Sequence, residues 1–443
     1  MTTTHQEQKV PAKPGTPSGQ SPRGNRTIAS QGLVLFIAWV ISAMEGYDLA
    51  VYGASVPAIL QDPGLNVDLA QVGIMGSVVG IGMLFGAGFA GAMVHRFGHL
   101  RLIAFGIAIF SLGMVANALA PTAAVFGIGR LVVGVGLGIV LPMVNAYVSD
   151  ISEPRKVARN VGLAMSGYAI GAMCAPLLAA LLMGQSYRWL YIIGIAPVVL
   201  VAFMYRRLPD SPVFLRRKGN EELAALIEAK YNLPSTKANP SDRPGRFLGL
   251  GALFAPGVRT STLLFWALSF CGLLLVFGIS AWLPTMLQAI GYSLGSALIQ
   301  TVAMWAGVAT GVILGGRIAE VIGTKAIVIC AFLVGAISLL LMSLQPPVWI
   351  FYILVFVSGF GFIGSQILGN ALIATRYAPA LRGNGLSWAL AIGRVGAIVG
   401  PSLGAWVLTS PLSDEWNFYA FAIPALVGAT AAALVPRMVG RSS

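Results

Sequence analysis

The sequence is poor in charge. Only 10% of its 443 residues are Asp, Glu, Lys or Arg, against roughly 25% in soluble globular proteins. Hydrophobic residues make up 57% and the mean hydropathy is +0.81, so a folded surface of this composition could not face water on every side. We therefore expect an integral membrane protein rather than two or three soluble domains.

Cysteine and histidine are scarce as well, with three of each. The cysteines lie within apolar runs and show no C-x-x-C spacing, which argues against a disulfide framework and against a metal site. No histidine lies at membrane depth to serve as the base for a nucleophile, and no G-x-x-x-x-G-K-[ST] loop is present to bind nucleotide phosphates. We expect no enzymatic activity and no cofactor.

Acidic residues are outnumbered 28 to 15 by Lys and Arg, which gives a formal net charge of +13. Such an excess could indicate nucleic-acid binding, but its distribution indicates a topology instead. When both termini are placed on one side of a membrane, nearly all basic residues fall on that side, and Arg130, Arg188 and Arg394 are the exceptions. The positive-inside rule predicts a multi-pass protein of the bacterial cytoplasmic membrane, with both termini cytoplasmic, membrane lipids as partners and no nucleic acid.

Apolar runs long enough to cross a hydrocarbon core of about 30 Å predict an all-α protein with twelve transmembrane helices. Their approximate bounds are 31–60, 69–94, 101–120, 123–149, 158–183, 188–206, 259–290, 294–320, 325–344, 347–375, 382–409 and 416–436. The polar residues 1–28 precede them, contain no signal peptide and are expected to form a disordered cytoplasmic tail.

The chain is similar to itself at an offset of 225 residues, which aligns Gly91 with Gly316, Gly98 with Gly323 and Asn145 with Asn370. We therefore predict two pseudo-symmetric six-helix halves, with a substrate site between them as in transporters built from parallel repeats. The predicted units are the halves 29–206 and 259–437, a cytoplasmic linker at 207–258 and a cytoplasmic C-terminus at 438–443.

The loop after the second span reads Gly91-Ala-Met-Val-His95-Arg96-Phe-Gly98, and its repeat runs from Gly316 to Gly323. Both resemble the G-x-x-x-D-R-x-G-R-R signature of the major facilitator superfamily. The resemblance implies alternating access and a gating role for Gly91, His95, Arg96, Gly98, Gly316, Glu320 and Gly323. His95 stands where the superfamily has an acid, so the first-half latch is in doubt whereas Glu320 can keep the second. Alternatively, His95 faces solvent and takes no part in gating.

Three further segments resemble the aromatic acid:proton symporter branch of that superfamily: Glu45-Gly46-Tyr47-Asp48, Leu208-Pro209-Asp210-Ser211-Pro212 and Gly393-Arg394-Val-Gly396. The branch usually has Asp in place of Glu45, so the charge is kept on a longer side chain. The resemblance implies proton-coupled uptake of a small organic anion, such as a benzoate or hydroxybenzoate, by a protein that we expect to be monomeric.

Four ionisable residues, Glu45, Asp48, Arg130 and Arg394, lie within predicted spans, where each charge costs about 2.5–3.5 kcal/mol on insertion scales. Glu45, Asp48 and Tyr52 share one helix face at i, i+3 and i+7. Two carboxylates so close repel each other, and a proton held by either relieves the repulsion. We predict that Glu45 and Asp48 carry the coupling protons. The alternative is that they only form ion pairs with the arginines and hold the halves together.

The planar guanidinium of Arg394 suits a carboxylate, so we predict that it binds the substrate anion. The other predicted substrate contacts are Arg130, Tyr52, Asn145, Gln366, Asn370 and Trp388. Aromatic residues expected near the cavity also include Tyr47, Tyr147, Trp266, Phe270, Phe277 and Trp305. Either arginine could instead serve a structural ion pair. An exporter, a carrier of non-aromatic acids or sugar-like solutes, and a membrane sensor without transport remain alternatives.

Overall fold

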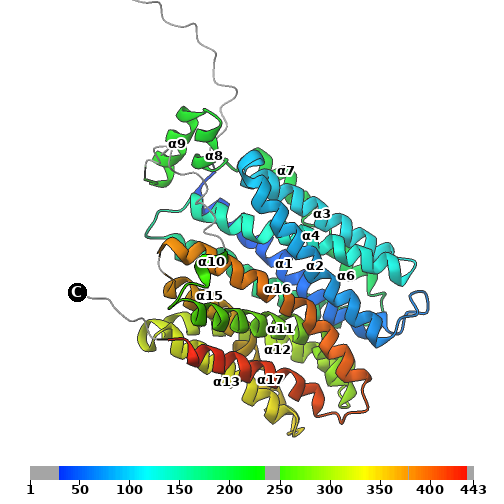
Figure 1. Ribbon diagram of the computed structural model, residues 1–443. Helices are drawn as coiled ribbons and strands as arrows, with labels where there is room; N and C mark the ends of the chain where they lie inside the picture. Colours follow the sequence, from blue (N-terminus) through cyan, green and yellow to red (C-terminus); the bar gives the residue numbers. More distant parts are fainter. Residues whose placement is uncertain (1–28, 235–249, 378, 437–443) are drawn as a thin grey trace, which may run out of the picture.

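The computed structural model describes residues 29–234, 250–377 and 379–436, and these residues form helices and connecting turns without any strand (Figure 1). The predicted tail at 1–28, the C-terminus at 438–443 and the middle of the predicted linker lie outside the described residues.

The first half contains seven helices. They are α1 (Gln31–Ile59), α2 (Leu69–Phe97), α3 (His99–Leu119), α4 (Ala123–Asp150), α5 (Val157–Leu181), α6 (Arg188–Ile193) and α7 (Val198–Arg207). Two short helices of the linker follow, α8 (Pro212–Arg217) and α9 (Glu221–Tyr231), and α10 (Leu250–Leu253) precedes the second half.

The second half repeats the arrangement of the first. It comprises α11 (Arg259–Ala289), α12 (Leu294–Ile322), α13 (Thr324–Met342), α14 (Val348–Gly359), the π-helical turn η1 (Phe360–Gly364), α15 (Ser365–Arg376), α16 (Pro379–Thr409) and α17 (Trp416–Leu434). In Figure 1 the first half, in blue and cyan, lies beside the second half, in green, yellow and red.

Eleven of the described helices, counting Val348–Arg376 as one, are long and apolar enough to cross a membrane, and they lie at eleven of the predicted spans. The span predicted at 188–206 is divided into α6 and α7, which are separated by turns at 194–197. Pro197 has no N–H to donate to the preceding turn, and its ring disfavours helical backbone at Ala196, which accounts for the break. The apolar segment Arg188–Val201 still provides a twelfth, interrupted helix.

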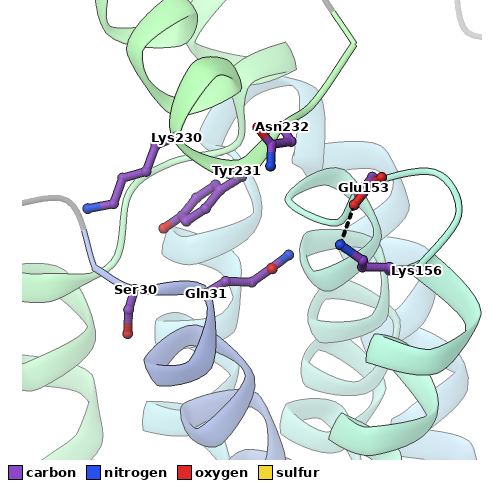
Figure 2. Close-up of a pocket in the computed structure, with 7 residues that line it drawn as sticks. All are labelled: Ser30, Gln31, Glu153, Lys156, Lys230, Tyr231 and Asn232. Atoms are coloured by element: carbon purple, nitrogen blue, oxygen red, sulfur yellow. Dashed lines mark ion pairs between the residues drawn. The ribbon is translucent and has the colours of Figure 1, made fainter.

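The linker helices α8 and α9 pack on the first half at one end of the bundle, which we call the linker face (Figure 1). The hydroxyl of Tyr231 donates to the carbonyl of Ala29 at 2.9 Å, and the Gln31 amide donates to the carbonyl of Ile151 at 3.2 Å. A polar cavity of about 270 Å³ lies between these elements (Figure 2). Its lining residues are Ser30, Gln31, Glu153, Lys156, Lys230, Tyr231 and Asn232.

Glycines let the two halves approach closely at the opposite end, which we call the far face. A β-carbon at Gly53 on α1 would lie 1.8 Å from the carbonyl oxygen of Ser280 on α11. Another at Gly73 on α2 would lie 2.4 Å from Cβ of Ala405 on α16. One turn from Gly73, the hydroxyls of Ser77 and Ser402 are hydrogen-bonded at 2.8 Å. The halves are therefore sealed at the far face.

Glycines nearer the linker face have no close neighbours. A β-carbon at Gly88 or Gly91 on α2, or at Gly316 on α12, would have no neighbour within 4 Å. The glycines of α2 thus differ in role along one helix. Those near the far face permit close packing between the halves, whereas those near the linker face have room around them.

We expect Gly53→Ala to open the far face, because its methyl group would collide with the backbone at Ser280 and force α1 away from α11. The measurement is a pulsed EPR distance between spin labels at Gln61 and Ser293, in a background whose native cysteines are replaced by serine. Gly88→Ala is the matched control, since its methyl group enters open space. A distance distribution unchanged by Gly53→Ala would contradict this account of the seal.

Candidate functional site

A buried ion pair links two helices of the first half. Nη1 of Arg130 on α4 donates to Oδ1 of Asp48 on α1 at 3.1 Å, and the exposed fractions of the two side chains are 3% and 0%. The guanidinium carbon also lies 4.6 Å from the ring centroid of Tyr52, within cation–π range. The Tyr52 hydroxyl donates in turn to the carbonyl of Val72. Tyr52 thus contributes a ring face that holds Arg130 beside Asp48.

Glu45 faces the other arginine. The Glu45 side chain is 5% exposed. Its carboxylate interacts electrostatically with Arg394 on α16, across the boundary between the halves. The two side chains do not form a direct ion pair. Nη1 of the half-buried Arg394 also lies 3.1 Å from the sulfur of Met83 on α2. One carboxylate oxygen of Glu45 is buried and has no hydrogen-bond partner. The arrangement is therefore a charged pair with unused hydrogen-bonding capacity.

The structure assigns each acid of α1 to a different arginine. Asp48 pairs with Arg130 inside one half, whereas Glu45 acts on Arg394 across the two halves. The alternative prediction is that the acids only form ion pairs that hold the two halves together. The Asp48–Arg130 pair fits this alternative poorly, because both residues belong to the same half. Glu45 and Arg394 span the boundary without closing a bond.

Two of the three predicted amide contacts, Gln366 and Asn370, lie on α15 in the second half. Nε2 of Gln366 donates to Oδ1 of Asn370 at 3.2 Å, and Oε1 of Gln366 is buried without a partner. That oxygen lies 2.0 Å from the position a β-carbon at Gly272 would take. The π-helical turn η1 ends immediately before this helix, and such turns occur frequently at functional sites.

The structure places two other predicted substrate contacts nearer the linker face. Trp388 packs against Trp266 with ring centroids 6.4 Å apart, and Trp266 contacts Phe254 beside α10. Asn145 lies near the end of α4, with a buried oxygen that has no partner. Neither residue has a described contact with Arg394, so their substrate-binding role stays a prediction.

The predicted gating residues are found at the linker face. Gly98 and Gly323, which correspond in the repeat, both have left-handed backbone, with φ of 80° and 89°, a conformation that favours glycine. Nδ1 of His95 lies 2.6 Å from Nη1 of Arg217 on α8. This contact joins the first loop to the linker helices, whereas Glu320 is exposed. The predicted latch and its weakening by His95 stay predictions.

Sequence reasoning missed Tyr168 on α5, which interacts electrostatically with both Glu45 and Arg394. The internal repeat contained a signal for Tyr168. The helices α5 and α16 are equivalent in the two halves, and the 225-residue offset aligns Tyr168 with Gly393, the neighbour of Arg394 in sequence. Gly167 and Gly171 also flank Tyr168 on the face of α5 that packs against α1.

A family model described as the Major Facilitator Superfamily matches residues 38–315 and 296–442. The chain belongs to the major facilitator superfamily. It is 34% identical to the benzoate transport protein of Acinetobacter baylyi, over 89% of this chain and 87% of that one. It is 29% identical to the gentisate transporter of Corynebacterium glutamicum (94% and 92%) and 29% identical to the 4-hydroxybenzoate transporter PcaK of Pseudomonas aeruginosa (93% and 94%). The predicted superfamily and its aromatic acid branch are confirmed.

Solved structures show the same fold at low sequence identity. The D-xylose-proton symporter matches with a TM-score of 0.73 and 19% identity, over 93% of this chain and 98% of that chain. The nucleoside transporter NupG, in a mutant form, matches with a TM-score of 0.71 and 16% identity, over 92% and 100%. The predicted major facilitator fold, with two halves, is therefore confirmed.

We expect the Asp48–Arg130 pair to behave as one unit in a stability measurement. Arg130→Met should lower the thermal stability of the purified protein, because removing one partner of a buried ion pair costs about 3–5 kcal/mol in soluble proteins. Combining it with Asp48→Leu should restore much of that loss, since no uncompensated charge remains.

The more exposed Asp62–Arg188 pair, at 3.3 Å, supplies the matched control. Asp62→Leu and Arg188→Met should each have a smaller effect, as accessible ion pairs contribute about 0–1 kcal/mol. If the losses caused by Asp48→Leu and Arg130→Met were simply additive, the pairing described here would be wrong.

Proposed function

We propose that the protein takes up small aromatic carboxylates together with protons by alternating access. Arg394 binds the substrate carboxylate, and Glu45 and Asp48 carry the protons. The observation that carries the proposal is the placement of Arg394, a cation of the second half whose Nη1 lies 3.1 Å from the sulfur of Met83 in the first half, together with a buried Glu45 oxygen that has no hydrogen-bond partner among the described residues. Relatives named for transport of benzoate, gentisate and 4-hydroxybenzoate support the choice of substrate class.

In this proposal the linker face is cytoplasmic. Basic residues gather there, which is the distribution expected of cytoplasmic loops in a bacterial inner membrane. The seal at the far face then makes the structure an inward-facing state. Both arginines of the site and both acids come from one chain, so a monomer contains all the groups that the mechanism requires.

Charge balance explains how a proton is coupled to the anion. Without substrate, the negative charge of Glu45 offsets Arg394. A substrate carboxylate brings a second negative charge to the same guanidinium, so a proton on Glu45 restores the original net charge of the site. The cycle therefore moves the anion and the proton together, because either one alone leaves an uncompensated charge in the membrane.

The second acid acts within the first half. Protonation of Asp48 weakens its ion pair with Arg130, while the Tyr52 ring retains the guanidinium by a cation–π contact. Arg130 can then keep its position through the change in charge. In this proposal Asp48 and Arg130 form a proton site next to the substrate site, and α1 connects the two because it carries both acids.

We expect Asp48→Asn to abolish concentrative uptake, because an amide cannot release and bind the coupling proton. Glu45→Gln should also impair uptake, since Arg394 would lose the charge that competes with substrate. The measurement is accumulation of labelled benzoate in cells or proteoliposomes, with and without an uncoupler, and Glu222→Gln on the exposed face of α9 serves as a control acid outside the site. Full uncoupler-sensitive accumulation by Asp48→Asn would remove Asp48 as a coupling residue.

We expect Arg394→Lys to weaken binding of the best acid although the positive charge is kept, because an ammonium cannot reproduce the two-donor geometry of a guanidinium. A lost charge-assisted contact should cost about 1.5–3 kcal/mol, which corresponds to roughly 10- to 150-fold in the dissociation constant. Isothermal titration of the purified variant tests this, with Arg317→Lys as a control at the linker face. An unchanged dissociation constant would contradict the assignment of Arg394 as the residue that binds the substrate carboxylate.

A further inference from the structure

Close packing of α1 against α5 fixes Tyr168 beside the charged site. A β-carbon at Gly46 would lie 1.8 Å from the carbonyl oxygen of Tyr168, and one at Gly171 would lie 1.6 Å from the carbonyl oxygen of Ala43. With the two backbones in contact, the half-buried Tyr168 side chain has Glu45 and Arg394 as electrostatic neighbours. Tyr168 is thus held against α1 at Gly46, the residue that follows Glu45.

Across the boundary between the halves, Tyr168 meets an aromatic residue of the second half. The ring of Trp305 on α12 packs edge-on against it, with centroids 6.3 Å apart and an interplanar angle of 61°. Edge-to-face packing is a favoured arrangement for aromatic groups. The contact therefore joins the two halves with groups suited to an aromatic ligand.

The indole of Trp305 carries a second indication of a ligand. The side chain is 0% exposed, and its N–H has no hydrogen-bond partner. Buried donors are nearly always satisfied in folded proteins. In Trp282, which is buried to the same extent, the indole N–H donates to the carbonyl of Pro401 at 2.7 Å. Among the described residues, the Trp305 N–H thus has no acceptor, as is also the case for Trp266.

We propose that Tyr168 and Trp305 form the subsite that recognises the ring of the substrate and sets a preference for aromatic over saturated acids. This inference rests on the proposed binding of the carboxylate by Arg394. The ring of the bound acid packs against Tyr168, and the indole N–H of Trp305 donates to a hydroxyl on that ring. Hydroxylated benzoates therefore satisfy both features, whereas cyclohexanecarboxylate satisfies neither.

The test compares three acids that share a carboxylate and differ in the ring: benzoate, 4-hydroxybenzoate and cyclohexanecarboxylate. Dissociation constants are measured by isothermal titration on the purified full-length protein and two variants. Tyr168→Leu removes the aromatic ring, and Trp305→Phe keeps a ring but removes the N–H. Tyr419→Leu, near the far face, and Trp349→Phe, at an exposed side chain, are matched controls. Size-exclusion profiles check that each variant is folded.

Tyr168→Leu should weaken benzoate binding about 3- to 10-fold, the range expected for one aromatic contact, and leave cyclohexanecarboxylate nearly unchanged. Trp305→Phe should weaken 4-hydroxybenzoate about 2- to 10-fold through the lost hydrogen bond, and leave benzoate nearly unchanged. The two control variants should not alter these ratios.

The outcomes separate this inference from the proposed function. If the unmodified protein binds none of the three acids, the proposed function fails. If it binds them and Tyr168→Leu weakens benzoate and cyclohexanecarboxylate equally, recognition of the ring by Tyr168 is overturned while the function stands. If Trp305→Phe weakens the binding of benzoate and of 4-hydroxybenzoate equally, the indole N–H is not the donor to the ring hydroxyl.

Discussion

Four charged side chains within the membrane-spanning helices constrain the whole arrangement, because an uncompensated charge at membrane depth is costly. Glu45, Asp48, Arg130 and Arg394 carry formal charges that cancel, and the structure divides them into two sets. Asp48 and Arg130 are in direct contact within one half, so while Asp48 is ionised their charges cancel locally in any arrangement of the halves. Glu45 and Arg394 come from different halves, so their balance depends on how the halves are placed and on what lies between them.

Small residues make that division sterically feasible. Glycines on α1 and α5 bring those helices into backbone contact, which sets Tyr168 beside Glu45. Glycines of α2 let it approach α16 near the far face, and Arg394 lies further along α16 on the same side, within reach of Met83. Long charged side chains can meet at the boundary because the backbones on either side of them are close.

Much of the fold follows from composition and periodicity. Apolar runs predicted twelve spans, at eleven of which the structure has a helix long enough to cross a membrane, and the 225-residue repeat predicted the two halves. The interruption at Pro197 was readable in principle, but an apolar run alone does not distinguish a continuous helix from two pieces. Periodicity placed Glu45, Asp48 and Tyr52 on one face of α1. It could not tell which arginine each acid meets, because that depends on how α4, α5 and α16 pack around α1. The contact of His95 with Arg217 was unpredictable for the same reason, since it joins segments far apart in sequence.

The seal at the far face and the charge of the site act on the same pair of helices. α2 and α16 are joined near the far face by the hydrogen bond between Ser77 and Ser402, and α16 carries Arg394 about two turns away, at 1.5 Å of rise per residue. A change in what balances Arg394 therefore acts on the helix that forms the seal. In the proposed mechanism, the halves can rock without exposing a net charge to the membrane when Glu45 or a bound anion neutralises Arg394. When neither does so, the unbalanced guanidinium opposes the motion. A proton-coupled carrier needs this distinction, because its empty but protonated form must not cross between the two states.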